Sequence, residues 1–407
     1  MRKIPDRLVL FTQGFPFENG EVFLRREIEF LSREYERILI VPYYAVGIPT
    51  PLPPNVSTKT LPDIWEIPHD TWSQSFRKHS FEIFKFFFAE MRAQFRNSKV
   101  WKLARENFAL VKYFYALSDL IQPIIEEFNP ERTIFYSYWC NDRATLLGIL
   151  KKAGKIKFAI SRIHGFDLYA DQNPYIRFRP FQVRNLDAIL PISAHGSEYL
   201  KKLFPQSADR FHTFKLGVGN RNLNPFSATD IFTIVSCSAI ASHKRVKEIA
   251  TVVSGLDKPA RWIHFGNGPE LEAVMKIAIG AHEHIKIELR GAVPNDEILN
   301  FYETNCVHLF LNFSVVEGIP FSIMEAISFG IPVLGVDIGG ISEIVTPKTG
   351  ILLGPKALNL DLRDGINQFR DLEIFNPTFR EGVKNFWAGN FDENHNFTQF
   401  IRFLKQV

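Results

Sequence analysis

Residues 314–345 read SVVEGIPFSIMEAISFGIPVLGVDIGGISEIV, the densest cluster of residues with special backbone properties in the chain. Gly318 permits a positive φ. Pro320 suits the first turn of a helix, where its missing N–H costs nothing. We therefore expect Glu317 in a loop and Glu325 in the helix that follows, then an apolar strand that ends before a glycine pair.

The length and composition indicate a folded protein of two domains. The chain has 407 residues, whereas one domain usually holds about 100–200. Its hydrophobic fraction of 46% is typical of packed globular proteins. The net charge of +4 suits anionic partners such as nucleotides or acidic lipid head groups, and it does not by itself predict nucleic-acid binding.

The spacing of the cysteines and the lengths of the apolar runs indicate where in the cell the protein is expected. Cys140, Cys237 and Cys306 have neither zinc-ligand spacing nor the even count of a disulfide framework, which favours a reducing cytoplasm. The N-terminal apolar run is too short for a signal peptide, and no stretch reaches the roughly 18 apolar residues of a spanning helix. We expect a cytoplasmic protein, soluble or bound at the inner face of the cell membrane.

Strands and helices alternate along the first half of the chain. The expected strands are 7–12, 38–41, 133–136, 158–163 and 188–192, and the expected helices are 21–34, 141–152 and 198–203. This βαβ alternation predicts a parallel sheet, with its ligand side beyond the carboxyl ends of the strands. The loop with Gly20 and Glu21 follows the first strand, so it is either a ligand loop or an ordinary connection. The proline-rich stretch 44–70 is predicted to be a long loop.

Residues 76–105 interleave Lys and Arg with Phe and Trp, and only Glu82 and Glu90 are acidic. A basic, aromatic, helical segment can lie on an anionic membrane. The alternative is a pair of helices that packs its Phe face on the core and leaves Lys and Arg in solvent. We favour core packing for most of these Phe residues and keep membrane contact as a second hypothesis.

The alternation restarts after a polar linker at 220–230. The expected strands are 231–236, 262–265, 285–289 and 307–312, with helices at 246–256, from 270, and at 297–304. After Gly354 we expect less regular secondary structure, followed by a terminal amphipathic helix. We predict a first domain at 1–219, a second at 220–390, and a C-terminal helix at 391–407 that packs back on the first domain.

Glu317 and Glu325 flank a predicted helix start. Free N–H groups at such a start bind phosphate, and a carboxylate can accept hydrogen bonds from two sugar hydroxyls, which suits a nucleotide-sugar. The alternative is two surface glutamates near a turn. A glycosidase pair is disfavoured, because eight helical steps span about 12 Å, beyond the roughly 5–9.5 Å that glycosidase carboxyls require.

Three further segments could bind a ligand. Lys244 and Arg245 follow a strand and could neutralise a diphosphate; without an anion they would be unfavourable at a helix N-terminus. Gly266 and Gly268 form half of a dinucleotide fingerprint. His164 ends a strand, but a lone histidine is more often structural. We found no metal-ligand cluster, Walker loop or Gly-x-Ser-x-Gly motif, so no metal or cofactor is expected.

Residues 317–345 resemble the Glu-x7-Glu signature of retaining GT-B glycosyltransferases of family 4, including FGIPV and GG-x-x-E-I-V. VSCSAIASHKRV, HFGNGPELE and RGAVPNDEILNFY resemble, in order, the family's strand-loop-lysine element, its glycine loop and the segment that lines its base pocket. FTQGFPFENGEVFLRREIEFL and SRIHGFDLY resemble its bacterial branch that builds capsular, exopolysaccharide or colanic-acid-type glycans. The resemblance implies an α/β GT-B fold, with two Rossmann-like β/α/β domains facing across a cleft.

By this resemblance, His164, Glu317 and Lys244 are the catalytic residues. His164 contacts the sugar near the reacting carbon, Glu317 faces the donor sugar, Lys244 binds the diphosphate and Glu325 holds the ribose. The other expected substrate contacts are Gly318, Ile319, Pro320, Phe321, Ser322, Ser238, Arg245, Gly266, Gly268, Val293, Gly20 and Glu21.

The chain departs from the family pattern at two places. Ser238 stands where the family usually has an arginine six residues before the lysine, which makes Arg245 the candidate to share that role. Gly20-Glu21 replaces the usual glycine pair, which makes Glu21 a candidate acceptor contact.

The implied reaction transfers a sugar from a nucleoside-diphosphate-sugar, UDP favoured over GDP, to a hydroxyl of a glycan or lipid-linked oligosaccharide. The anomeric configuration is retained, without a metal or a protein nucleophile. One alternative is a GT-B nucleotide-sugar epimerase, which would convert the donor without an acceptor. Another is a non-catalytic sugar-nucleotide-binding protein of polysaccharide assembly, which would be expected to lack His164, Glu325 or Lys244.

Overall fold

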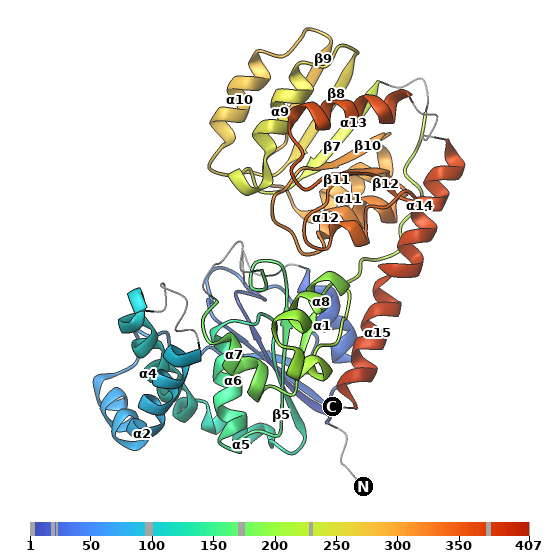
Figure 1. The fold of residues 1–407 in the computed structure, drawn as a ribbon. Helices are drawn as coiled ribbons and strands as arrows, with labels where there is room; N and C mark the ends of the chain where they lie inside the picture. The colour runs from blue at the N-terminus through green and yellow to red at the C-terminus, as the bar shows by residue number, and fades with distance from the viewer. Residues whose placement is uncertain are drawn as a thin grey trace. The chain divides into compact units, whose positions relative to one another are not determined.

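The computed structural model describes residues 5–17, 21, 23–93, 101–169, 176–227, 231–371 and 376–406. The chain folds as two compact units (Figure 1). The N-terminal unit comprises Met1–Ile192, Gly196–Phe214 and Phe397–Val407, and the C-terminal unit comprises Ser193–His195 and Lys215–Asn396.

The N-terminal unit is built on a six-stranded parallel sheet with the order β3-β2-β1-β4-β5-β6. Its strands are β1 (Arg7–Thr12), β2 (Arg37–Pro42), β3 (Val56–Thr58), β4 (Thr133–Ser137), β5 (Phe158–Ile163) and β6 (Ala188–Pro191). In register, Leu8 pairs with Ile38 on one side and with Ile134 on the other. The central strands are continuous apolar runs, as expected for a sheet covered on both faces.

Helices cover both faces of this sheet. They are α1 (Leu24–Ser32), α2 (His69–Ala93), α4 (Ala104–Leu120), α5 (Gln122–Phe128), α6 (Asp142–Lys152), α7 (Arg179–Asn185), α8 (Ala194–Leu203) and α15 (Glu393–Leu404). Side chains alternate across β1: Val9 and Phe11 join the core with α4 and α6, and Leu8 and Leu10 join the core with α1 and α15.

The C-terminal unit has a second six-stranded parallel sheet, ordered β12-β11-β10-β7-β8-β9. Its strands are β7 (Phe232–Cys237), β8 (Ala260–Phe265), β9 (Ile285–Leu289), β10 (Leu309–Asn312), β11 (Val333–Val336) and β12 (Gly350–Leu353). Its helices are α9 (Val246–Ser254), α10 (Leu271–Ile279), α11 (Asn295–Thr304), α12 (Phe321–Ser328), α13 (Asn359–Asp371) and α14 (Pro377–Asn390), with short 3-10 turns at Ser242–Lys244 and Ile341–Glu343.

Both sheets have the same topology. Numbered from its own first strand, each has the order 3-2-1-4-5-6 of a Rossmann fold. The predicted α/β architecture of two Rossmann-like domains is confirmed. In this topology the strand order reverses between the first and fourth strands, and the loops after these two strands form the ligand-binding crevice. Those strands are β1 and β4 in one unit, and β7 and β10 in the other.

The structure corrects two local predictions. The stretch 44–70 is not all loop, because it contains β3 and the start of α2. Order does not weaken after Gly354, where α13 and α14 follow. α13 looks polar in sequence because only Leu362, Ile366 and Phe369, spaced at helical intervals, anchor it in the core.

The basic aromatic segment 76–105 lies in α2 and α4, apart from residues 94–100, which fall outside the described ranges, and residues 101–103, which precede α4. Core packing holds for Phe86, which is buried against Phe181. The expectation of core packing for most of these Phe residues is wrong, because Phe81, Phe84 and Phe88 are exposed. Within the described ranges no single helix is long and apolar enough to cross a membrane, but the bent pair of α4 and α5 together satisfies that test by length and composition alone.

Candidate functional site

The switch point of the C-terminal unit brings Lys244 and Glu317 together. Lys244 follows β7 and Glu317 follows β10. The Nζ atom of Lys244 lies 2.5 Å from Oε1 of Glu317, and the two side chains are 21% and 10% exposed. The side-chain amide of Asn312, at the end of β10, donates to the same carboxylate oxygen at 3.4 Å. Two residues that belong to separate sequence motifs therefore form one ion pair at the crevice.

The helix predicted after Glu317 is present. α12 begins at Phe321 with Pro320 as its N-cap, and Ser322 follows in the first turn. The first amides of a helix have no intrahelical acceptor, and with the helix dipole they favour an anion. The five predicted contact residues, Gly318, Ile319, Pro320, Phe321 and Ser322, thus lead into this helix start.

Gly340 packs against the loop that precedes α12. The Gly340 amide donates to the Gly318 carbonyl at 3.0 Å. A Cβ on Gly340 would lie 2.8 Å from that oxygen and 2.8 Å from Ile319. The close approach explains the second glycine of the Gly339-Gly340 pair, because any side chain there would push residues 318–319 away.

Glu325 lies within α12, half-buried, and its Oε1 accepts from the side-chain amide of Asn295 at 2.8 Å. Burial raises the pKa of Glu325 to about 7, against the opposing influence of Asn295 and of the Arg221 charge. Asn295 begins α11, and Val293 lies two residues before it. The predicted base-pocket segment is therefore tied to the predicted ribose ligand through Asn295, which sequence reasoning missed.

Ser238, Gly266 and Gly268 also come together, at the ends of β7 and β8. Gly266 has φ +144°, and a Cβ there would lie 1.8 Å from the Ser238 carbonyl oxygen. A Cβ on Gly268 would lie 2.4 Å from the carbonyl oxygen of Ile240. These glycines are thus explained by the close packing of two loops, independent of any ligand.

A buried chain of hydrogen bonds positions the Ser238 loop. The sequence did not predict it. Trp262 Nε1 donates to Ser236 Oγ at 2.9 Å, and Ser236 Oγ lies 2.8 Å from His264 Nδ1. His264 Nε2 lies 3.1 Å from the Ser238 carbonyl oxygen. Burial lowers the pKa of His264 to about 4, so the ring is neutral at pH 7. Nε2 must carry the proton in order to donate to that carbonyl.

The side chain of Arg245 contacts Phe313 and Ala357 instead of joining the Lys244–Glu317 pair. Its guanidinium lies 3.8 Å from the centre of the Phe313 ring, and it donates to the carbonyl of Ala357 at 3.0 Å. The residue itself has a φ of 53°, which makes the turn into α9.

In the N-terminal unit, His164 directly follows β5 and is buried against aromatic rings. Its ring centre lies 4.3 Å from that of Trp139 and 4.9 Å from that of Tyr138. Neither ring nitrogen has a hydrogen-bond partner among the described residues. Burial, with a smaller contribution from the Arg162 charge, holds the pKa of His164 well below its usual value. The imidazole is therefore neutral at pH 7.

Two carboxylates brace the loops around His164. The Asp167 carboxylate accepts from the amides of Cys140 at 2.8 Å and His164 at 2.7 Å, and so joins the ends of β4 and β5. Neither the sequence spacing nor the residue type had singled out this function for Asp167.

Glu21 forms a second brace. Its carboxylate accepts from the amides of Gln13 at 2.6 Å, Gly14 at 3.0 Å and Phe15 at 2.9 Å, and from Trp139 Nε1 at 2.7 Å. The carboxylate thus binds the loop after β1 to the loop after β4. Gly20 lies outside the described residues.

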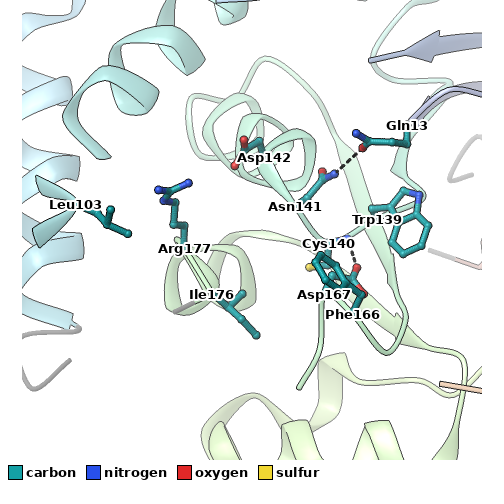
Figure 2. Close-up of a pocket in the computed structure, with 10 residues that line it drawn as sticks. All are labelled: Gln13, Leu103, Trp139, Cys140, Asn141, Asp142, Phe166, Asp167, Ile176 and Arg177. Carbon is teal, nitrogen blue, oxygen red and sulfur yellow. Dashed lines mark hydrogen bonds between the residues drawn. The ribbon is translucent and has the colours of Figure 1, made fainter. Parts of the chain in front are cut away.

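A cavity of about 600 Å³ opens at the switch point of this unit (Figure 2). It is lined by Gln13, Leu103, Trp139, Cys140, Asn141, Asp142, Phe166, Asp167, Ile176 and Arg177. Figure 2 shows Gln13 and Asn141 hydrogen-bonded on one side, with Arg177 on the other. Among the described residues no group of three His, Cys, Asp or Glu side chains is placed to hold a metal ion.

The C-terminal unit, which carries the Lys244–Glu317 pair, also carries a known family signature. Residues 224–385 match the family model Glycosyl transferases group 1. One curated relative is the putative teichuronic acid biosynthesis glycosyltransferase TuaC of Bacillus subtilis, 24% identical over 157 residues, which are 39% of this chain and 38% of the relative. The chain spans between 28% and 50% of the length of the curated relatives it matches.

Solved structures resemble the chain over nearly its whole length. The lipopolysaccharide outer core galactosyltransferase WaaB has a TM-score of 0.66 at 14% identity, covering 97% of this chain and 99% of that one. Anabaena Alr3699/HepE in complex with UDP and glucose has a TM-score of 0.64 at 14% identity, covering 98% and 100%. The chain therefore has a GT-B-like glycosyltransferase fold.

Proposed function

We propose that this chain is a retaining glycosyltransferase that moves a sugar from a nucleoside-diphosphate-sugar, UDP favoured over GDP, to a hydroxyl of a glycan or lipid-linked oligosaccharide. The observation that carries the proposal is the Lys244–Glu317 ion pair beside the start of α12. A cation, the amides of a helix start and two carboxylates match a diphosphate that lies between two sugars. The UDP complexes of structural neighbours and the family match support it.

In the donor complex, the diphosphate takes the place of Glu317 as the partner of Lys244. Glu317 then accepts hydrogen bonds from hydroxyls of the transferred sugar, and Glu325 accepts from the ribose. Val293 and its neighbours provide the wall for the base. The ion pair of the free protein keeps Lys244 extended at the crevice until an anion arrives.

The chemical step breaks the bond between the anomeric carbon and the diphosphate oxygen. The acceptor oxygen bonds to that carbon on the same face, and its proton passes to the departing phosphate. Lys244 and the amides of α12 stabilise the charge that develops on the diphosphate, the kind of electrostatic stabilisation that is often the largest catalytic contribution. No protein nucleophile is needed in this scheme.

The acceptor binds in the cavity of the N-terminal unit. Trp139 and Phe166 offer ring faces that suit the apolar face of a sugar, and Gln13, Asn141 and Arg177 offer groups that hydrogen-bond to hydroxyls. The neutral imidazole of His164 packs against Trp139 beside this cavity. A growing bacterial surface glycan at the inner face of the membrane fits this acceptor class, in line with the named role of TuaC.

A panel of nucleotide-sugars tests the proposal. We expect UDP and one UDP-sugar to raise the melting temperature, GDP to leave it unchanged, and the matching UDP-sugar to yield a glycosylated product whose anomeric configuration is that of the donor. Conversion of the donor without an acceptor would indicate an epimerase instead. Binding without turnover against a broad panel of acceptor glycans would indicate a non-catalytic binding protein.

A further inference from the structure

The long helix α2 carries a surface stripe that the proposed function does not use. Phe81, Phe84 and Phe88 lie on it and are 73%, 43% and 63% exposed. A contiguous patch of exposed apolar side chains marks an interaction surface, whereas single exposed apolar side chains are common on any soluble protein. The opposite side of the same helix packs inward through Ile83 and Phe86, which are both buried.

The stripe also carries cations. The exposed basic residues of α2 are Arg77, Lys78, Lys85 and Arg92. Successive residues of a helix are rotated by roughly 100° about its axis. Viewed along that axis, an arc of about 100° contains the three exposed phenylalanines together with Arg77, Lys85 and Arg92. We call these six residues the α2 stripe. Its length along the helix is about 22 Å, from fifteen steps of about 1.5 Å.

The acids of α2 lie away from the stripe. Glu90 is buried, and its carboxylate accepts from the Phe178 amide at 2.9 Å. Glu82 is half-buried. Asp70 is on the same face of the helix as the stripe but lies in the first turn, seven residues before Arg77 and about 10 Å from it along the axis. Lys78 forms an ion pair with Asp119 on α4 at 2.7 Å, which leaves Arg77, Lys85 and Arg92 as the cations of the α2 stripe.

The rings are held in place by a second helix. α2 packs along α4 (Figure 1), and the Phe84 ring lies 5.4 Å from that of Phe108 on α4 and 6.4 Å from that of Phe88. Lys85 Nζ lies 5.6 Å from the centre of the Phe81 ring. The stripe is therefore a preformed surface with aromatic rings and cations side by side.

We propose that the α2 stripe docks the protein on an anionic phospholipid bilayer. The phenylalanine rings enter the boundary between head groups and acyl chains, and Arg77, Lys85 and Arg92 pair with lipid phosphates. Charge complementarity selects this occupant: a purely apolar partner would leave three cations facing it, and a purely polar one would leave three phenylalanines in contact with water.

Flotation of the full chain with vesicles tests this docking. The wild type is expected to float with phosphatidylcholine vesicles that contain phosphatidylglycerol, to float far less with phosphatidylcholine alone, and to detach as salt rises. The charge variant R77Q/K85Q/R92Q should bind on the order of 100-fold more weakly, at about 1 kcal/mol for each lost cation. The aromatic variant F81S/F88S should lose more than roughly tenfold, because the buried apolar area disappears.

Matched changes on other exposed surfaces provide the controls. Met275 and Ile279 on α10 are 50% and 85% exposed, so M275S/I279S removes apolar surface elsewhere, and K202Q/K276Q/K348Q removes the same number of charges. Both controls should float like the wild type. Binding that is equal on neutral and anionic vesicles, or that falls equally in the controls, would overturn the proposal. So would a lipid-free dimer, detected by light scattering, that F81S/F88S dissociates.

Discussion

Lys244 and Glu317 are 73 residues apart in sequence, yet the ammonium nitrogen of one lies 2.5 Å from a carboxylate oxygen of the other. The contact arises because β7 and β10 are neighbours at the switch point of the sheet. In the free protein each residue neutralises the other. In the proposed donor complex they separate, Lys244 toward the diphosphate and Glu317 toward the sugar, so substitutions at the two positions should have opposite effects on nucleotide binding.

The Glu317→Gln substitution should separate nucleotide binding from transfer. Without the carboxylate, Lys244 is more available to phosphate, so the affinity for UDP should stay the same or rise. Turnover of the UDP-sugar should fall on the order of 10²-fold, because the sugar loses its charged hydrogen-bond acceptor. Calorimetry with UDP and a transfer assay measure the two effects. Glu272→Gln, on the exposed side of α10, is the control, and a variant that binds UDP more weakly but turns over normally would contradict this role.

The Glu325→Gln substitution should stabilise the free protein at alkaline pH. Burial raises the pKa of Glu325 from 4.5 to about 7, so its contribution to stability is full below about 4.5 and is lost as pH rises through about 7. Glutamine removes the ionisation. The melting temperature should rise by roughly 1–3 °C at pH 8, with a smaller gain at pH 5. A gain that grows as pH falls would contradict the assignment.

Glu21 should act mainly as a brace for the loops. It is 5% exposed, and Glu21→Ala would leave three backbone amides and the Trp139 indole without their acceptor. The unfolding free energy of the N-terminal unit, measured in urea, should fall by roughly 3 kcal/mol, while UDP affinity is unchanged. Glu126→Ala, on the exposed side of α5, should change it by less than about 0.5 kcal/mol. If Glu21 instead contacts the acceptor, Glu21→Gln would raise the acceptor KM and leave stability intact.

Phe166 tests the acceptor cavity without disturbing the core. Its side chain is 69% exposed, so Phe166→Ala should leave the melting temperature nearly unchanged. The acceptor KM should rise by roughly 3–10-fold, the loss of one stacking contact, with the donor KM unchanged. Equal increases in both KM values would indicate that the cavity does not bind the acceptor.

Features that repeat along the chain or lie close together in it could be predicted from the sequence. The apolar runs predicted the central strands of both sheets, and the glycine and proline after Glu317 predicted the start of α12. Two elements were not predicted: β3, a strand of three residues, and α13, which only three apolar side chains anchor. Short or sparsely anchored elements give too weak a periodic signal to be recognised.

The contacts that shape the candidate site were harder to predict, because they join distant parts of the chain. Glu21 and Trp139 are 118 residues apart, and Asn295 reaches Glu325 across 30 residues. Nothing in the local pattern distinguishes these side chains from solvated polar residues. The same holds for Arg245, whose guanidinium packs on Phe313, a contact that depends on the fold rather than on its position beside Lys244.

The most direct test of the proposed donor site is the calorimetric affinity of UDP for the wild type, Lys244→Ala and Lys247→Ala. Lys247, three residues after Lys244, is exposed in the first turn of α9 and serves as the matched control. If Lys244 binds the diphosphate, its loss should weaken UDP binding by roughly 10–150-fold, equivalent to a charge-assisted hydrogen bond of about 1.5–3 kcal/mol, while Lys247→Ala binds like the wild type. Unchanged UDP affinity in Lys244→Ala, or no binding of UDP to the wild type, would contradict the account.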